Sequence, residues 1–202
     1  MSAVSTHPTV SSAEETRERI AQAAIRLFAG HGFDGTSVRE IAEAAGVTKP
    51  VLYYHFGSKD QLYVAAIELC YEQFRKYLKE VVPTTGPFRD RLRTVVRVHF
   101  DYFVREQAIA RMLYSVAFAP QRNSPNVDFA QLEEPHLYML AGLIQDGIHA
   151  GEVRNLPAEE AALLLLGMMN IHLEAFIITG ETPGEKESER VVSVFTDGVI
   201  QR

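Results

Sequence analysis

The stretch TSVREIAEAAGVTKPVLYYHFGSK, residues 36–59, decides the fold of this 202-residue chain. Ser37 lies three residues ahead of Glu40, which is the spacing of a capping box, in which each side chain binds a free backbone N–H at the start of a helix. Apolar residues then recur at the three-to-four-residue spacing of one buried helical face. Gly46 follows, where a left-handed residue ends a helix at the least cost. The pattern therefore predicts a short helix that begins at about residue 38.

A second short helix is predicted directly after this turn. Thr48 is a favourable N-cap, and Pro50 is tolerated in the first turn, because its missing N–H has no intrahelical acceptor there. Leu52 and Phe56, four residues apart, are expected to anchor the helix inward. Two short helices joined by a glycine-containing turn form a helix-turn-helix, whose second helix can lie in the major groove of DNA. The residues left facing outward are Lys49, Val51, Tyr53 and Tyr54, with His55 near the end.

Charge is distributed unevenly along the chain. The formal net charge is −6, which argues against a protein that coats nucleic acid regardless of sequence. Residues 46–59 nevertheless contain no acidic side chain. Since phosphate contacts come from one face of a protein, a local acid-free segment is sufficient for specific binding. This segment coincides with the predicted reading helix.

The candidate DNA-binding side chains divide by chemistry. Arg39 and Lys49 have donors that suit guanine O6 and N7, and Val51 can contact a thymine methyl group. Hydroxyl, imidazole and ammonium donors suit phosphate oxygens, and Lys59 also stands at a helix start, where exposed N–H groups favour an anion. Other interpretations stay open: Tyr53 as a packing aromatic, His55 as a structural histidine and Arg39 as a solvated surface charge. The full candidate set is Ser37, Arg39, Thr48, Lys49, Pro50, Val51, Tyr53, Tyr54, His55 and Lys59.

The segment TSVREIAEAAGVTKPVLYYHFGSKDQL resembles the DNA-binding signature of TetR-family transcriptional regulators. An Ala-Gly-Val turn is followed by a Leu-Tyr-x-His-Phe helix and a Ser-Lys step, and the preceding RERIAQAAIRLFAGHGFDGTS is similar to that family's first helix and loop. The resemblance covers residues 17–62, and the rest of the chain is similar only in size and helical character. It implies an all-α homodimer that binds a palindromic operator and releases it when a small molecule enters the larger domain. It also implies that the positions of Arg39, Lys49, Pro50, Tyr53, Tyr54, His55 and Lys59 line the DNA.

The domain organisation predicted from these patterns has three parts. Residues 1–12 are rich in Ser, Thr and Pro and read as a disordered arm. Residues 13–60 form the helix-turn-helix domain, and residues 61–202 form a larger domain for ligand binding and dimerisation. Periodicity predicts helices and no strands in this part. The helices are expected at residues 58–80, 87–105, 108–117, 132–150, 158–179 and 187–200. Adjacent Glu133 and Glu134 are interpreted as a solvated start of the fourth of these.

The helix predicted at residues 158–179 is apolar nearly all round in the run LLLLGMMNIHLEAFII, which indicates buried contacts on more than one side. With the apolar residues of the last helix, it is predicted to form a four-helix bundle with the same pair of a second subunit. The alternative is that both helices only close the core of a monomer. The residues predicted to take part from the last helix are Val191, Val192, Phe195 and Val199.

Aromatic, Met and His residues are spread over the helices of the larger domain. A cavity lined by them suits an apolar or aromatic effector with a few polar groups to orient it. Any one of them alone is more often an ordinary core residue than a ligand contact. The histidines show no metal-ligand spacing, so neither a metal nor a cofactor is expected. The candidate ligand-binding residues are Tyr71, Phe74, His99, Phe103, Tyr114, Phe118, His136, Met168 and His172.

The sequence predicts no enzyme, since it contains no phosphate-binding loop, no nucleophile elbow and no zinc-protease motif. Apolar runs such as residues 161–169 are too short for a membrane span, and a single cysteine, Cys70, fits a reducing compartment, so a cytoplasmic protein is expected. Cys70 is interpreted as a core residue, with redox sensing as the alternative. A ligand-released transcriptional repressor fits all of this, with two alternatives. One is an activator or DNA-organising protein on the same fold, and the other is a helical carrier of hydrophobic molecules.

Overall fold

The computed structural model describes residues 12–118 and 123–199 of the chain, and this part contains nine helices and no strand. The prediction of an all-α protein is therefore confirmed. Most of the predicted disordered arm lies outside the described residues, and Ser12 already belongs to the first helix. The helices are α1 Ser12–His31, α2 Val38–Ala44, α3 Lys49–Phe56, α4 Lys59–Val81, α5 Phe88–Arg105, α6 Gln107–Phe118, α7 Phe129–His149, α8 Ala158–Thr179 and α9 Glu185–Val199.

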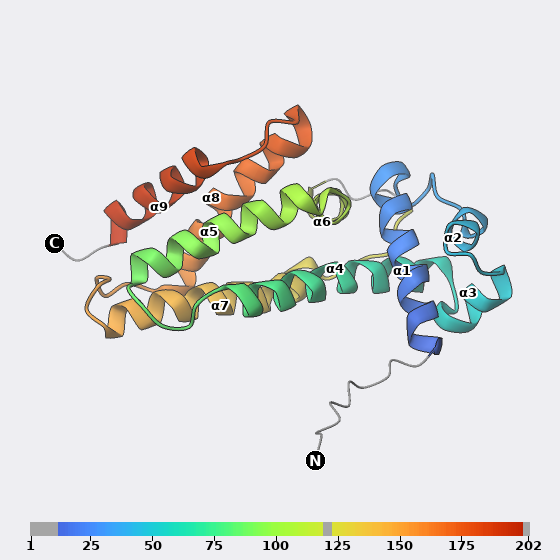
Figure 1. Cartoon of the computed structure of the whole chain (residues 1–202), viewed down its shortest axis with the longest axis horizontal. Helices are drawn as coiled ribbons and strands as arrows, with labels where there is room; N and C mark the ends of the chain where they lie inside the picture. The colour runs from blue at the N-terminus through green and yellow to red at the C-terminus, as the bar shows by residue number, and fades with distance from the viewer. Residues whose placement is uncertain (1–11, 119–122, 200–202) are drawn as a thin grey trace, which may run out of the picture.

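The molecule is elongated, with α1, α2 and α3 at one end and the larger helical part at the other (Figure 1). The long helix α4 starts beside α3 and extends into the larger part, where it contacts α5, α6 and α7. Helix α6 packs against α1, α7 packs along α8, and α9 packs on α5. Two helices, α4 and α6, therefore connect the N-terminal helices to the larger part of the chain.

The core begins in the N-terminal helices. Ile20, Ala24 and Phe28 of α1 are buried together with Leu52 and Phe56 of α3. The inward orientation predicted for Leu52 and Phe56 is therefore confirmed, and the buried residues of α1 support the helix-turn-helix. Burying large apolar side chains here stabilises the small domain by about 1.5–3 kcal/mol for each.

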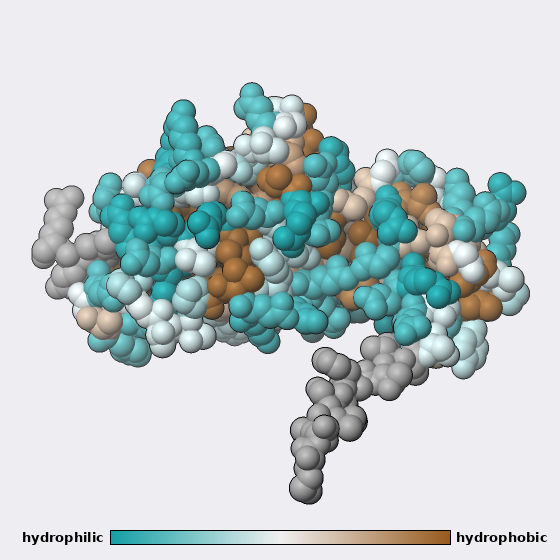
Figure 2. All heavy atoms as spheres, in the orientation of Figure 1, coloured by the Kyte–Doolittle hydropathy of each residue, from teal (hydrophilic) through white to brown (hydrophobic). Residues whose placement is uncertain are grey.

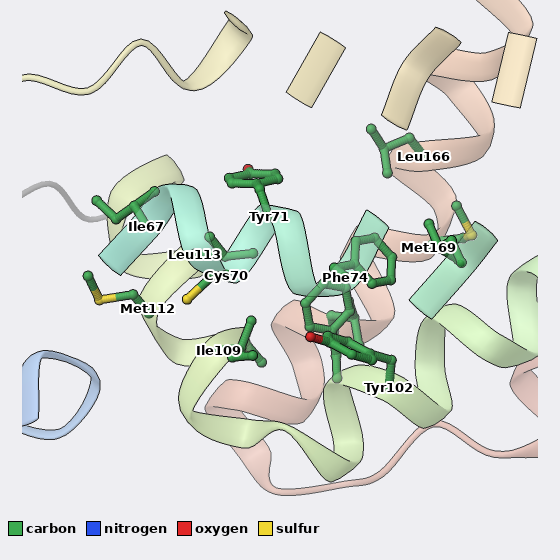
Figure 3. Close-up of a cluster of buried hydrophobic side chains, with 14 of the residues drawn as sticks. Ile67, Cys70, Tyr71, Phe74, Tyr102, Ile109, Met112, Leu113, Leu166 and Met169 are labelled. Atoms are coloured by element: carbon green, nitrogen blue, oxygen red, sulfur yellow. The ribbon is translucent and has the colours of Figure 1, made fainter. Parts of the chain in front are cut away.

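The same core continues into the larger part through α4. Figure 3 shows Cys70 of α4 among Ile67, Ile109, Met112 and Leu113, the last three of which belong to α6. Burial raises the pKa of the Cys70 thiol, which disfavours the reactive thiolate. Cys70 is thus a core residue, as its apolar sequence context indicated.

Helix α7 begins earlier than the sequence pattern predicted. It starts at Phe129 rather than at Leu132, because the carboxylate of Asp128 accepts a hydrogen bond from the N–H of Gln131 at 3.0 Å and acts as the N-cap. Pro135 then lies inside the helix. Because of this early start, Glu133 lies in the second turn of α7, where its side chain reaches the interior of the larger part of the molecule.

Helix α8 corrects the expectation that no segment approaches a membrane span. In the described part of the chain, α8 alone is long and apolar enough to cross a membrane, with a mean hydropathy of 1.9 over its 18-residue window. This is a statement of length and composition only. About 39% of that window is buried inside the protein, where α8 packs against α7 and α5.

Candidate DNA-binding surface and effector pocket

The start of α2 has the geometry that the capping-box spacing predicted. The hydroxyl of Ser37 accepts the N–H of Glu40 at 3.2 Å, and the Glu40 carboxylate accepts the N–H of Ser37 at 2.8 Å. The hydrogen bonds from Ser37 lower the pKa of Glu40. This reciprocal pair fixes where α2, the first helix of the motif, begins.

The turn between α2 and α3 depends on one backbone conformation. Gly46 has a φ of +65°, a left-handed conformation that other residues adopt only with strain. Its N–H and that of Val47 bond to the carbonyls of Glu43 and Ala42 and close the end of α2. Thr48 is the N-cap of α3 by position, but its side chain makes no capping hydrogen bond.

Helix α3 presents one polar and aromatic face to solvent. Leu52 and Phe56 are buried, whereas Lys49, Pro50, Val51, Tyr53 and Tyr54 are exposed and His55 is half-buried. Tyr54 has 85% of its surface accessible, the highest value among the exposed large hydrophobic and aromatic side chains of the described residues. Figure 2 shows hydrophobic atoms in several separate places on this side of the molecule, some of them at the end that carries α1, α2 and α3. The face is thus available to a partner.

Two candidate cations contact groups of the protein itself. The Arg39 guanidinium lies 3.5 Å from the Glu43 carboxylate, one turn along α2, and both side chains are mostly exposed. The Lys59 ammonium lies over the Phe33 ring, 4.2 Å from its centre. An exposed ion pair of this kind contributes about 0–1 kcal/mol, so Arg39 can exchange Glu43 for a base or phosphate at small cost. Their roles in DNA binding stay predictions.

A cavity lies in the larger part of the molecule between α4, α5, α6, α7 and α8, with a free volume of about 60 Å³. The structure brings six of the nine candidate ligand-binding residues to this cavity: Tyr71, Phe74, His99, Phe103, Tyr114 and His136. Met168 and His172 do not line it; the His172 ring packs against Phe100 instead. The side chain of Phe118 lies outside the described residues.

Glu133 corrects the interpretation of a solvated helix start. Its side chain is only 12% exposed. One of its oxygens accepts the Tyr71 hydroxyl at 2.9 Å, and the other lies 2.9 Å from Nδ1 of His136. Burial and the Glu133 carboxylate raise the pKa of Tyr71, so its hydroxyl keeps the proton that it donates. Tyr71, Glu133 and His136 therefore form one hydrogen-bonded group at the cavity.

Sequence reasoning missed several lining residues. Small and aliphatic residues of α6 and α8 complete the wall, and they carry no sequence signal that separates them from other core residues. Asn170 and Glu174 of α8 are polar residues in an apolar helix, and that contrast was the signal that could have found them. The lining residues not predicted are Ala110, Leu113, Ala117, Phe129, Glu133, Asn170, Leu173, Glu174 and Ile177. Among the described residues, no group of three or more His, Cys, Asp or Glu side chains is placed to hold a metal.

The apolar surface of the last two helices differs from the prediction. Val191, Val192 and Phe195 of α9 are buried within the chain, where α9 packs on α5, so they are not free for a second subunit. The side chain of Val199 lies outside the described residues. Large apolar side chains are instead exposed along α8 and at one position of α9: Leu163, Leu164, Ile171, Ile178 and Val194.

Comparisons with known proteins decide the family. A family model described as bacterial regulatory proteins of the tetR family matches residues 20–66. A second, described as a tetracyclin repressor-like C-terminal domain, matches residues 85–199, which is more than half of the chain. This chain belongs to the TetR family. TetR-family proteins are DNA-binding transcriptional regulators and not enzymes, so the prediction that the chain has no catalytic activity is confirmed.

Two curated relatives and one solved structure are similar to this TetR-family chain. The transcriptional activator FasR of Mycolicibacterium smegmatis is 34% identical over 50% of this chain and 46% of its own length. The transcriptional repressor NicS of Pseudomonas putida is 30% identical over 50% of this chain and 48% of its own length. The match thus spans about half the length of each relative. The crystal structure of Bacillus subtilis FadR with stearoyl-CoA superimposes with a TM-score of 0.77 over 90% of this chain and 98% of FadR, at 20% identity, which shows a common fold.

Proposed function

We propose that this TetR-family regulator is a cytoplasmic repressor that binds a palindromic operator as a homodimer and releases it when an apolar or aromatic effector enters the cavity. The observation that carries the proposal is the face of α3. It is exposed, it lacks carboxylates, and it combines a lysine donor with two tyrosine hydroxyls. Such a face suits a DNA groove, since base edges and phosphates both take hydrogen bonds from it.

Within α3, Lys49 and Val51 are assigned to base edges, because they stand at the N-terminal end, which enters the major groove most deeply in helix-turn-helix proteins. Tyr53, Tyr54 and His55 are assigned to phosphates. Leu52 and Phe56 are buried on the opposite side of the helix, so contacts on the outer face do not disturb the packing that holds α3 in place.

The exposed stripe of α8 supports a homodimer. Leu164, Ile171 and Ile178 follow one another at seven-residue spacing and are all more than half exposed, so they lie on one side of the helix. Exposed Gly167 on the same side lets a second helix approach closely. A stripe of this kind on both subunits suits the two-fold interface that is commonest among homodimers, and such a dimer would carry the two α3 helices that a palindromic operator requires.

The coupling between cavity and DNA is assigned to α4 and α6. The free volume is smaller than an aromatic effector requires, so an effector must move the cavity walls. Tyr71 and Phe74 of α4 and Tyr114 of α6 belong to those walls, and α6 packs on α1. A hydrogen bond from Asn123 to Asp34, at 3.2 Å, also joins the segment after α6 to the segment after α1. Movement of α4 or α6 therefore changes the position of α3.

Activation of transcription is the second candidate for the direction of control. NicS is a repressor and FasR an activator, and both share only about half of their length with this chain. In vitro transcription from a promoter that carries the operator separates the two. Repression predicts fewer transcripts on addition of the protein, and activation predicts more.

The proposal is tested by selecting binding sites from random duplex DNA with the purified full-length chain. The expected result is a consensus with inverted symmetry, whose half-sites lie one helical turn apart, about 34 Å, or somewhat more. A selection that yields no consensus contradicts the proposal. Ligand binding without any selected sequence would support a helical carrier instead.

A further inference from the structure

Two histidines at the cavity have ring nitrogens with no hydrogen-bond partner. Both nitrogens of His99 and Nε2 of His136 are buried and meet no partner in hydrogen-bonding geometry, and the nearby Asn170 side chain only opposes part of the lowering of the His99 pKa. Each residue is only 2% exposed. The rings come from α5 and α7 and stack with their centres 5.5 Å apart and an interplanar angle of 18°. Buried polar atoms in folded proteins are nearly always paired, so these three nitrogens require an explanation.

The hydrogen-bonded group around Glu133 assigns the proton of His136. Glu133 accepts from Tyr71 with one oxygen and meets Nδ1 of His136 with the other. Since an ionised carboxylate only accepts hydrogen bonds, Nδ1 carries the proton. In the neutral ring, Nε2 then has a free lone pair and is an acceptor. Nε2 of His136 therefore needs a hydrogen-bond donor at the cavity.

His99 offers the complementary group. Burial and the neighbouring His136 hold the pKa of His99 well below its usual range, so the ring is neutral and has one N–H and one lone pair. Phe74 and Phe103 pack against the His99 ring, and Phe74 also contacts the His136 ring. Phenylalanine rings have no hydrogen-bond donor or acceptor to offer in the plane of the imidazole, so they do not pair with these nitrogens. Asn170 and Glu174 of α8 face the same cavity.

We propose that the effector carries an uncharged hydroxyl group, which accepts the N–H of His99 and donates to Nε2 of His136. The proposal rests on the function proposed above, in which this cavity receives the effector. A hydroxyl oxygen both donates and accepts at about 2.7–2.8 Å, and the two stacked rings line the same cavity with their centres 5.5 Å apart, so one hydroxyl group is assigned to both. The apolar remainder of the effector packs against Phe74 and Phe103. A phenol or a hydroxylated hydrophobic molecule has this chemistry.

The same side chains disfavour charged effectors. A carboxylate only accepts hydrogen bonds, so it leaves Nε2 of His136 without a donor, and it approaches the negative Glu133. An ammonium group only donates, so it leaves the His99 N–H without an acceptor. Either ion also loses its hydration in an apolar cavity. A neutral group that both donates and accepts avoids all of these costs.

The test compares four probes of nearly equal size with the full-length protein: toluene, 4-methylphenol, 4-methylbenzoate and 4-methylbenzylammonium. Calorimetry gives their dissociation constants. The expected order places 4-methylphenol at least ~10-fold tighter than toluene, because two hydrogen bonds are added at a prepared site. Equal binding of toluene and 4-methylphenol overturns the proposal, as does tighter binding of either ion, or no binding of any probe.

Variants test which side chains cause the preference for 4-methylphenol over toluene. His99→Phe and His136→Phe each keep a ring but remove the nitrogens, so both are expected to bind toluene and to lose most of the preference for 4-methylphenol. His172→Phe is the matched control, because this histidine packs on Phe100 outside the cavity lining, and its preference is expected to equal that of the unaltered protein. A preference that survives in both cavity variants overturns the proposal. Operator binding without probes is measured in parallel, so a failure of the DNA-binding function is seen separately.

Discussion

At the residue scale, Lys49 and Lys59 divide base recognition from phosphate binding. Lys49 opens α3 on an exposed face, whereas Lys59 opens α4 and lies over the Phe33 ring. Lys49→Ala is expected to cost about 1–3 kcal/mol on the best site and little on random duplex, because a base contact is lost. Fluorescence anisotropy with both duplexes measures the difference. Equal losses on both would contradict the assignment.

Lys59→Ala is the matched variant for a phosphate contact. It is expected to weaken selected and random duplexes by the same factor and to make the salt dependence of binding shallower by about one unit of slope. Thermal unfolding is measured alongside, since the contact with Phe33 is also lost. A loss confined to the selected site would show that Lys59 reads sequence.

His99 gives a pH prediction with a defined sign. Its pKa in the folded protein lies below the ordinary value, so the unfolded chain binds a proton first as the pH falls. The free energy of unfolding is then unaffected by this group above about pH 6.5 and decreases below it, by at most ~1.4 kcal/mol for each pH unit. His99→Phe should remove this part of the acid sensitivity, as urea unfolding at pH 7.5 and 5.5 would measure.

Three other ionisable side chains line the cavity, namely Glu133, Glu174 and His136. The comparison between His99→Phe and the unaltered protein isolates the single histidine. His172→Phe serves as the control, because its ring is partly exposed beside Phe100. Equal acid responses of the unaltered protein and His99→Phe would show that His99 is not the group responsible.

The sequence identified the face of α3 more completely than it identified the cavity. Residues 46–59 lie close together in sequence, so local spacing is enough to place Leu52 inward and Tyr54 outward. The cavity is built from five helices, and its polar residues are recognised only once those helices are packed. Glu133 beside Glu134 read as a solvated pair, because nothing local shows that Tyr71, 62 residues away, donates to it.

At the scale of elements, the capping residues decide where helices begin. Ser37→Ala removes the hydroxyl that accepts the Glu40 N–H, so it is expected to lower the free energy of unfolding by about 1 kcal/mol. Thr48→Ala is the control, because Thr48 is an N-cap without a capping hydrogen bond. It is expected to lower the free energy of unfolding by only a few tenths of the Ser37→Ala effect. Urea unfolding at fixed protein concentration measures both. Equal effects would mean that the capping box does not stabilise α2.

Helix ends were predictable where a cap or glycine marks them. The bounds of α8 agree with the predicted range, since Pro157 precedes its start and Gly180 has a left-handed conformation at its end. The start of α7 was missed by three residues because the first aliphatic residue of its periodic pattern, Leu132, follows the true cap at Asp128. Periodicity locates the buried face of a helix better than its first turn.

At the scale of the whole molecule, the proposed dimer depends on the outer side of α8. Ile171→Arg places a charge in the middle of the exposed stripe, where Ile171 is 57% exposed, and is expected to raise the dimer dissociation constant at least ~30-fold, because a buried unpaired charge is costly. Val81→Arg, at an exposed valine of α4, is the control and should leave the dimer intact. Analytical ultracentrifugation measures both. A dimer that tolerates Ile171→Arg must use another surface.

The side of α8 that we propose for the dimer was harder to predict from sequence than the helix itself. Helix α8 is apolar on more than one side, and α9 is strongly amphipathic. The sequence alone does not say which side of either helix meets the rest of the chain. Packing on α5 takes Val191, Val192 and Phe195 into the core. Large apolar side chains of α8 stay exposed, and only the tertiary structure shows that this side of α8 is free for the dimer that we propose.

The central claim is that two copies of α3 read one duplex, and sedimentation of the purified chain with labelled duplexes tests it most directly. At about 150 mM salt, the account predicts two chains on an inverted-repeat duplex taken from the selected consensus, bound at least ~10³-fold tighter than a scrambled duplex. One chain for each duplex, or equal affinity for consensus and scrambled sequences, would contradict it.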